Sequence, residues 1–152
     1  MSDPVGASGR SAEEVARLST ESMLAADAAT RMLGIELREV GPGLAVAAMT
    51  VRADMLNGWQ SVHGGLIASL ADTAFAVACN SRGQVTVASG FDVDFIEPAR
   101  LGDVLVATAT ETALRGRSGI YDIRVTRESD GTTIAEFRGR SRSVGTINPA
   151  VG

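Results

Sequence analysis

Two features between residues 63 and 80 could do chemistry: an isolated acid and the pair of glycines before it. Asp72 is the only charged residue between Gly64 and Asn80. A buried or half-buried carboxylate is costly unless it is paired, and such groups are over-represented at functional sites. Two interpretations of Asp72 stay open: a catalytic carboxylate, and a structural one that bonds a neighbouring backbone group or arginine.

The run His63-Gly64-Gly65 precedes Asp72 at the start of a helix that we expect from His63 to about Ser81. The first turn of a helix has unsatisfied N–H donors and the positive end of the helix dipole. Glycines let a ligand approach the backbone closely. Gly64 and Gly65 could therefore bind an oxyanion or a polarised carbonyl oxygen.

Two rival catalytic groups lie in the same segment. His63 could be the base of a Ser-His-Asp hydrolase, but the G-x-S-x-G motif is missing and Asp72 lies about half a turn round the helix from it. We therefore favour an orienting or structural role for His63. Cys79 lies on the Asp72 face in an apolar setting without a second histidine, which favours an inert thiol.

A helical wheel shows why this segment needs cover on both sides. Leu66, Ile67, Leu70, Ala74 and Val77 share one face, which can pack on a sheet. The opposite face holds only small or polar residues besides Asp72: Gly65, Ala68, Ser69, Ala76 and Cys79. A helix that is apolar or small all round is usually buried all round. A sheet wrapped around the helix, a second subunit, or both must supply the cover.

The elements around this helix predict an α+β fold with an antiparallel sheet. One or two helices are expected from Ala12 to about Met32, capped by Ser11 with Glu14 as its capping-box partner. Strands are expected at residues 35–40, 44–51, 85–96, 104–114, 119–127 and 132–144, with hairpin turns at Gly41-Pro42-Gly43 and Asp130-Gly131. Residues 1–10 are expected to be a flexible tail, and residues 11–152 a single domain.

Composition excludes several classes of protein. The net charge of −4 argues against binding nucleic acid through a basic surface. With 1 cysteine and 1 histidine, neither an internal disulfide nor a multi-histidine metal site can form, so no metal site is expected. All 14 basic residues are arginine, which excludes Schiff-base chemistry. Without an apolar membrane span or a signal peptide, we expect a soluble cytoplasmic protein.

The motifs together resemble the hotdog-fold acyl-CoA thioesterases, and most closely those of the phenylacetate-degradation (PaaI) type. The resemblance covers residues 31–145. The matching segments are Asn57-Gly58, His63-Gly64-Gly65, Leu70-Ala71-Asp72-Thr73-Ala74, Asp94-Phe95-Ile96-Glu97-Pro98-Ala99, Ala78-Cys79-Asn80-Ser81, Gly119-Ile120-Tyr121-Asp122-Ile123 and Phe137-Arg138-Gly139-Arg140-Ser141. It implies a long central helix wrapped by a six-stranded antiparallel sheet. Two subunits would form one continuous sheet, with active sites at the dimer interface and, in many members, dimers paired into homotetramers.

The resemblance also implies roles for individual residues. Asp72 would be the catalytic carboxylate, acting as nucleophile or as general base on water. The Gly64 N–H would polarise the thioester carbonyl, and His63 and Asn57 would orient the site, with Asn57 near the acid or the lytic water. The acid and the Gly64 N–H that act on one substrate would come from different subunits.

Further residues are candidates for binding the substrate. Arg138, Arg140 and Arg142 alternate along a strand and so share one face, which could hold the phosphates of coenzyme A, as could Arg115 and Arg117. The alternative for these arginines is a solvated sheet face. Trp59 could line an acyl pocket or pack at the dimer contact. Ser89 could place a hydroxyl near the water or simply face a neighbouring strand.

The expected activity is hydrolysis of phenylacetyl-CoA or hydroxyphenylacetyl-CoA to the free acid and CoA. Two alternatives remain: a thioesterase of the same fold for medium-chain aliphatic acyl-CoA, and a non-catalytic acyl-CoA-binding module, which would have lost the acid. A hotdog dehydratase is disfavoured by the combination of Asn57, Gly64 and Asp72. No cofactor is expected, because coenzyme A is part of the substrate and product. The expected partners are acyl-CoA and further copies of the chain, with neither nucleic acid nor membrane.

Overall fold

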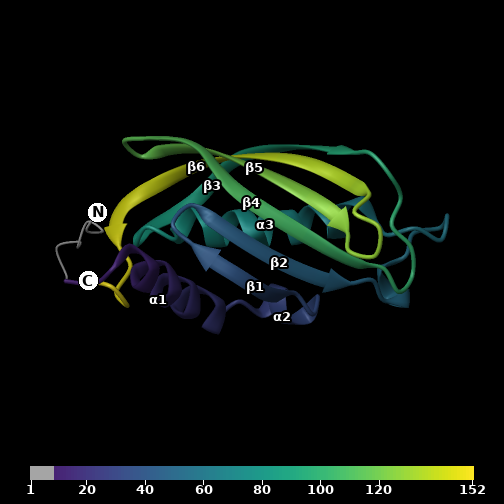
Figure 1. The fold of residues 1–152 in the computed structure, drawn as a ribbon, viewed down its shortest axis with the longest axis horizontal. Helices are drawn as coiled ribbons and strands as arrows, with labels where there is room; N and C mark the ends of the chain where they lie inside the picture. Colours follow the sequence, from purple (N-terminus) through teal and green to yellow (C-terminus); the bar gives the residue numbers. More distant parts are fainter. Residues whose placement is uncertain (1–8) are drawn as a thin grey trace.

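A computed structural model describes residues 9–152 and consists of a curved sheet that covers one long helix (Figure 1). The helix is α3 (Gly64–Asn80). The remaining elements, in chain order, are α1 (Ala12–Ala25), α2 (Ala28–Met32), β1 (Glu36–Gly41), β2 (Leu44–Thr50), a 3-10 turn (Ala53–Met55), β3 (Gln84–Phe95), β4 (Val104–Arg115), β5 (Ser118–Arg127) and β6 (Thr133–Ile147). The predicted α+β hotdog architecture is confirmed.

The strands form one six-stranded sheet in the order β1-β2-β4-β5-β6-β3, with every neighbouring pair antiparallel. Both predicted hairpin turns form: β1 and β2 pair across Gly41↔Leu44, and Gly131 takes a φ of 73° between β5 and β6. Strand β3 follows α3 in the chain but lies at the edge of the sheet, where β6 is its one partner strand among residues 9–152. Its free edge is long, because β3 has 12 residues.

The core lies between α3 and the inner face of the sheet. Phe75 is central, because its ring contacts Tyr121 of β5 and Phe137 of β6, with ring centroids 5.6 and 6.0 Å apart. Gly139 makes room for it, since a Cβ there would lie 2.7 Å from Phe75 Cζ. Phe75 lies outside the sheet-facing side that the helical wheel predicts, which comprises Leu66, Ile67, Leu70, Ala74 and Val77. The buried face of α3 is therefore wider than expected and reaches from Ile67 through Phe75 to Ala78.

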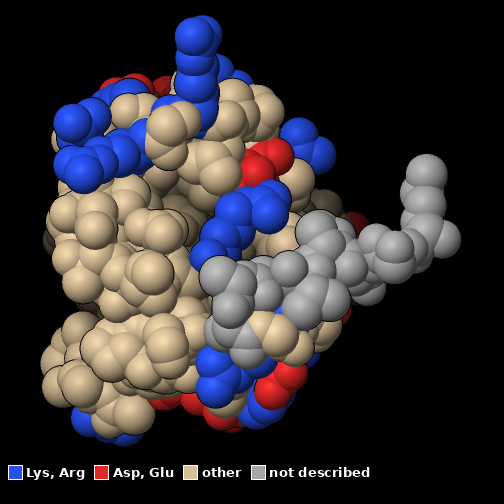
Figure 2. Space-filling view, turned by 90° about the vertical axis from the view of Figure 1, so that its left-hand side faces the viewer, with Lys and Arg blue, Asp and Glu red and all other residues tan. Residues whose placement is uncertain are grey.

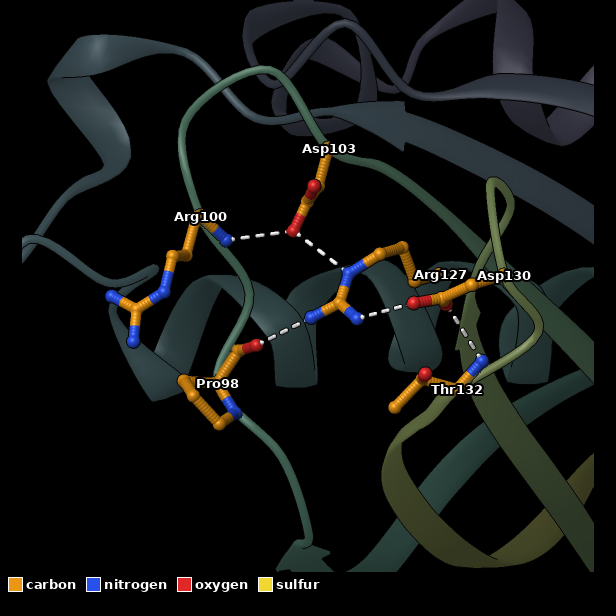
Figure 3. Close-up of polar contacts among 6 residues, drawn as sticks. All are labelled: Pro98, Arg100, Asp103, Arg127, Asp130 and Thr132. Atoms are coloured by element: carbon orange, nitrogen blue, oxygen red, sulfur yellow. Dashed lines mark hydrogen bonds and ion pairs between the residues drawn. The ribbon is translucent and has the colours of Figure 1, made fainter.

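One arginine connects the loops at the end of the sheet where β4 begins (Figure 3). Arg127 donates to Asp103 Oδ2 (3.1 Å), to Asp130 Oδ2 (2.9 Å) and to the carbonyl oxygen of Pro98 (2.9 Å). Asp103 Oδ2 also accepts the backbone N–H of Arg100 at 2.8 Å. Because the loop from Pro98 to Asp103 and the β5–β6 turn share this guanidinium, their positions are coupled.

The N-terminal helix packs beside β1, and both ends of the described chain lie at the same end of the molecule (Figure 1). Half of the predicted capping box is present: the Ser11 side chain accepts the Glu14 N–H, but within the described residues the Glu14 side chain makes no bond back to the Ser11 N–H. Residues 1–8 of the predicted tail lie outside the described residues, whereas Arg10 donates to the Val151 carbonyl oxygen at 3.2 Å. Within residues 9–152, none of the helices has the length and apolar character needed to cross a membrane.

Candidate active site

Asp72 lies in the third turn of α3, half-buried and without a protein partner. No hydrogen bond or ion pair to its carboxylate is formed by any residue from 9 to 152. Burial raises the pKa of Asp72 above its ordinary value, and the negative charge of Asp27 adds to this effect. The structural alternative, in which a neighbour pairs with this carboxylate, is not seen within the described chain. Asp72 is thus free to act on a bound molecule.

The start of α3 offers unpaired N–H groups, as expected. His63 is the N-cap residue, but its side chain makes no capping bond. The N–H of Leu66 already bonds to the His63 carbonyl oxygen (2.9 Å), whereas those of Gly64 and Gly65 find no acceptor within residues 9–152. A Cβ on Gly64 would lie 2.9 Å from Phe95 Cζ, whereas one on Gly65 would meet only His63 Nδ1, at 3.9 Å. The Gly65 side is therefore open to a ligand.

Asp72 and the Gly64 N–H cannot meet on one substrate within a single chain. They are eight residues apart in one straight helix, which corresponds to about 12 Å along its axis. An attacking oxygen and an oxyanion donor must both lie about 3 Å from the reacting group. A complete site therefore needs a second source for one of the two groups.

The side chain of Asn57 organises the loop that leads to α3. Its Oδ1 accepts the N–H of Trp59 (2.8 Å) and of Ser61 (3.3 Å), and its Nδ2 donates to Ser61 Oγ (3.1 Å). The loop tip contains Gln60 with a φ of 60°. Trp59 is 87% exposed, so within the described chain it lines no pocket. His63 is also exposed.

The predicted arginine row lies on the outer face of the sheet, away from α3. Phe137 and Gly139 point inward to Phe75, so Arg138 and Arg140 between and beside them point outward. Arg138 binds Asp122 through two bonds of 2.7 and 3.0 Å, and Arg140 binds Asp92 at 2.7 Å. The structure therefore does not bring these two arginines together with Asp72, and their charges are already compensated.

The other candidate arginines are placed differently. Arg115, Arg117 and Arg142 are exposed, and none of them forms an ion pair with a residue of the described chain. Ser89 lies on the edge strand β3, where its Oγ donates to the Arg140 carbonyl oxygen at 3.1 Å. This bond fits the interpretation of Ser89 as a strand residue that faces its neighbour.

Cys79 lies two turns after Asp72 and is buried. Burial raises the pKa of its thiol to about 12, and the charge of Asp72 adds to this shift. The thiol is thus protonated at neutral pH, which agrees with the expected inert role. Cys79 also forms part of the wall of a cavity of about 460 Å³ at the C-terminal end of α3, which its sequence context does not indicate.

Large apolar side chains are exposed along the edge strand. Val87, Phe91, Phe95 and Ile96 are each at least 41% exposed. Phe91 and Phe95 pair with Gly139 and Ala135 and so lie on the inner face of the sheet, beside the Asp72 face of α3. An uncovered edge strand with apolar residues is a template for pairing with another chain.

Within residues 9–152, three or more His, Cys, Asp or Glu side chains do not come together in a way that could hold a metal ion.

Comparison with known proteins gives consistent matches. The model of the thioesterase superfamily matches residues 60–134. The acyl-coenzyme A thioesterase PaaI of Escherichia coli K12 is 48% identical over 119 residues, covering 78% of this chain and 84% of that protein. Human acyl-coenzyme A thioesterase 13 is 31% identical over 111 residues, covering 71% of this chain and 79% of that protein.

Solved structures agree with the sequence matches. The E. coli PaaI protein from the phenylacetic acid degradation operon superposes with a TM-score of 0.88 at 43% identity, covering 91% of this chain and 99% of that one. A mutant of the phenylacetic acid degradation protein PaaI from Thermus thermophilus gives a TM-score of 0.74 at 36% identity, covering 78% of this chain and 100% of that one.

Proposed function

The chain belongs to the thioesterase superfamily and is an acyl-CoA thioesterase of the PaaI type, and from this premise we propose that it hydrolyses aryl-acyl-CoA thioesters. The proposed substrates are phenylacetyl-CoA and hydroxyphenylacetyl-CoA, which are cleaved to the free acid and CoA. Support for the aryl group comes from the E. coli relative, whose structure is described as a protein of the phenylacetic acid degradation operon. The free carboxylate of Asp72 is the observation that carries the proposal.

Asp72 supplies the attack on the thioester carbonyl carbon. As a nucleophile, its carboxylate oxygen bonds to that carbon, the C–S bond breaks, CoA leaves as the thiolate, and water then hydrolyses the mixed anhydride. As a general base, it takes a proton from a water whose oxygen bonds to the same carbon, and the departing thiolate is then protonated. Both routes need an ionised carboxylate that no protein group occupies, and no residue from 9 to 152 bonds to the Asp72 carboxylate.

The backbone N–H of Gly64 polarises the carbonyl oxygen and stabilises the oxyanion that develops on it. This assignment rests on the donors that lack an acceptor at the start of α3 and on the open space beside Gly65. The distance of about 12 Å within one helix means that the Asp72 and Gly64 acting on one thioester belong to two chains. His63 and Asn57 position this region, the first as the N-cap residue and the second through its loop bonds.

The active form is a dimer, or a dimer of dimers. The edge of β3 supplies free backbone groups, and the apolar side chains beside it would be buried by a second copy. The small-residue face of α3 would be covered in the same contact. For the CoA phosphates we retain Arg115, Arg117 and Arg142, which are exposed and form no ion pair with a carboxylate of the described chain.

Hydrolysis rates over a panel of acyl-CoA esters test this function. The panel contains phenylacetyl-CoA, its ring-hydroxylated forms and medium-chain aliphatic esters, with the released thiol as the readout. The aryl esters should give the highest kcat/KM, and Asp72→Asn should lower kcat at least about 100-fold. Faster hydrolysis of aliphatic esters would overturn the proposed substrate. A folded Asp72→Asn variant with more than a tenth of wild-type activity would overturn the proposed role of Asp72.

A further inference from the structure

The ring of Phe95 lies against Gly64, the first residue of α3, whose N–H is the proposed donor to the thioester carbonyl. A Cβ on Gly64 would lie 2.9, 3.2 and 3.4 Å from Cζ, Cε2 and Cε1 of Phe95. Because a C–C single bond is about 1.5 Å long, Phe95 Cζ is at most about 4.4 Å from Gly64 Cα. An acyl ring one methylene beyond a carbonyl bound at Gly64 can therefore reach Phe95.

The direction of β3 places Phe95 at the start of α3, because the strand runs back along the helix. At the end of α3 the Asn80 side chain makes two hydrogen bonds of 2.9 Å to the backbone of Thr86. This end of α3 lies near the chain termini (Figure 1), since a Cβ on Gly83 would lie 3.0 Å from Val151 Cγ2. Figure 2 shows the same end of the molecule, where arginine side chains lie beside a broad surface without charges. Phe95 is therefore at the other end of α3.

Phe95 also has a surface that a ligand can contact. The three ring atoms nearest to Gly64 form the far edge of the ring, so this contact leaves the ring faces uncovered. Phe95 is 52% exposed, and no aromatic ring of residues 9–152 stacks on it. Phe91, four residues earlier on the same inner face, differs because its ring stacks on Phe137 with centroids 4.5 Å apart. Phe95 thus offers an unstacked aromatic ring beside the carbonyl site.

We propose that Phe95 is a specificity-determining residue, whose ring packs against the aromatic ring of an acyl group that is bound at the Gly64 N–H of the same chain. The proposal rests on the proposed aryl-acyl-CoA function. Aromatic pairs stabilise a contact beyond the burial of apolar area when the rings are offset-stacked or edge to face. Phe95 therefore favours an aryl group over a saturated group of the same size.

A structural role is the alternative, because Phe95 lies on the edge strand along which a second copy is proposed to pair. Phe91 and Phe95 are 41% and 52% exposed on the inner face of β3. A contact between chains alone would give the two side chains similar roles. A contact with the acyl group distinguishes Phe95, because its ring is the one beside Gly64.

The test compares phenylacetyl-CoA with cyclohexylacetyl-CoA, which has the same carbon skeleton and a saturated ring. The measured quantity is the ratio of kcat/KM for the two esters. Phe95→Leu should lower this ratio about two- to tenfold, as expected for the loss of one aromatic pair. Phe91→Leu is the matched control, because it makes the same substitution on the same face of the same strand, and it should leave the ratio unchanged.

The ratio does not depend on how much of a variant is folded and assembled, because both esters are assayed on one preparation. A variant that folds or pairs less well loses activity on both esters alike. Phe95→Met also removes the ring and should lower the ratio in the same way, so it replaces Phe95→Leu if the leucine is not tolerated.

The outcomes separate this inference from the function on which it rests. If wild type hydrolyses neither phenylacetyl-CoA nor its hydroxylated forms, the proposed function fails, and this inference fails with it. If wild type hydrolyses phenylacetyl-CoA but Phe95→Leu keeps the wild-type ratio, or Phe91→Leu lowers it as much, the function stands and the role of Phe95 is refuted.

Discussion

Replacing Asp72 by asparagine should make the protein more stable while it removes the activity. The carboxylate is half-buried and has no partner among residues 9–152, and both its burial and the charge of Asp27 raise its pKa in the folded state. Above that raised pKa the ionised group destabilises the folded state relative to the unfolded one. An amide of the same shape removes this penalty.

The expected gain at neutral pH is about 1 kcal/mol, within the range of about 0.5–2 kcal/mol that single stabilising substitutions commonly give. For a chain of this length, that corresponds to a rise of about 2–4 °C in Tm. The gain should vanish in acid, below the ordinary pKa of an aspartate, because the wild-type carboxyl is then protonated in both states.

Thermal unfolding at pH 7 and in acid, at one protein concentration, measures both effects. Glu39→Gln is the matched control, because Glu39 is exposed on β1 and forms no ion pair within the described chain, so its amide should leave Tm unchanged. If Asp72→Asn lowers Tm at pH 7, the carboxylate is paired in the assembled enzyme. If its gain persists in acid, the gain does not come from the ionised carboxylate. Either result would contradict the reasoning.

Three further outcomes follow from the same contacts. Asp72 must be ionised to act, and its pKa is raised, so the kcat/KM of wild type should be lost in acid with a midpoint above the ordinary pKa of an aspartate. A pH–rate profile measures this midpoint. Gly65→Ala should keep or raise Tm, because the new Cβ would meet only His63 Nδ1, at 3.9 Å. It should nevertheless lower kcat/KM, because the methyl group crowds the site of the thioester carbonyl. Unchanged kcat/KM would mean that the carbonyl binds elsewhere. Arg127→Met should lower the free energy of unfolding in denaturant by about 2 kcal/mol, because it leaves Asp103 without its guanidinium partner. Arg124→Met breaks only an exposed pair with Glu136 and should lower it by under about 1 kcal/mol.

The local pattern of the chain was enough to predict its elements. The helix expected from His63 to Ser81 is α3, and the glycine turns around Gly43 and Gly131 join the strands that they were predicted to join. These signals work because they depend on neighbours in sequence: helical spacing, turn residues and strand alternation. The uncharged face of α3 likewise predicted a surface that needs cover.

Contacts between distant residues could not be read in the same way. Cys79, Tyr121 and Ser141 form one cavity only because α3, β5 and β6 meet there, and no spacing in the sequence indicates it. Arg138 and Arg140 of β6 were predicted to bind phosphates because their partners, Asp122 and Asp92, lie on two other strands and are distant in sequence. Asn57 was predicted to lie near the acid, but within one chain its side chain is engaged in its own loop.

Exchange of subunits between two inactive variants tests the central claim, that Asp72 and the Gly64 N–H of different chains form one site. Gly64→Val should be inactive because its side chain blocks the carbonyl site. The fold should tolerate the valine, because the Phe95 ring that a Cβ would meet can adopt another rotamer. Each variant is first shown to be folded and dimeric, with Gly64→Ala as the replacement if the valine is not tolerated.

Mixing Gly64→Val with Asp72→Asn subunits at equal ratio gives hybrids in about half of the dimers, each with one intact site of two. About a quarter of wild-type activity should therefore return. If mass spectrometry shows that hybrid dimers have formed and no activity returns, the acid and the N–H act from one chain and the account of the site is wrong.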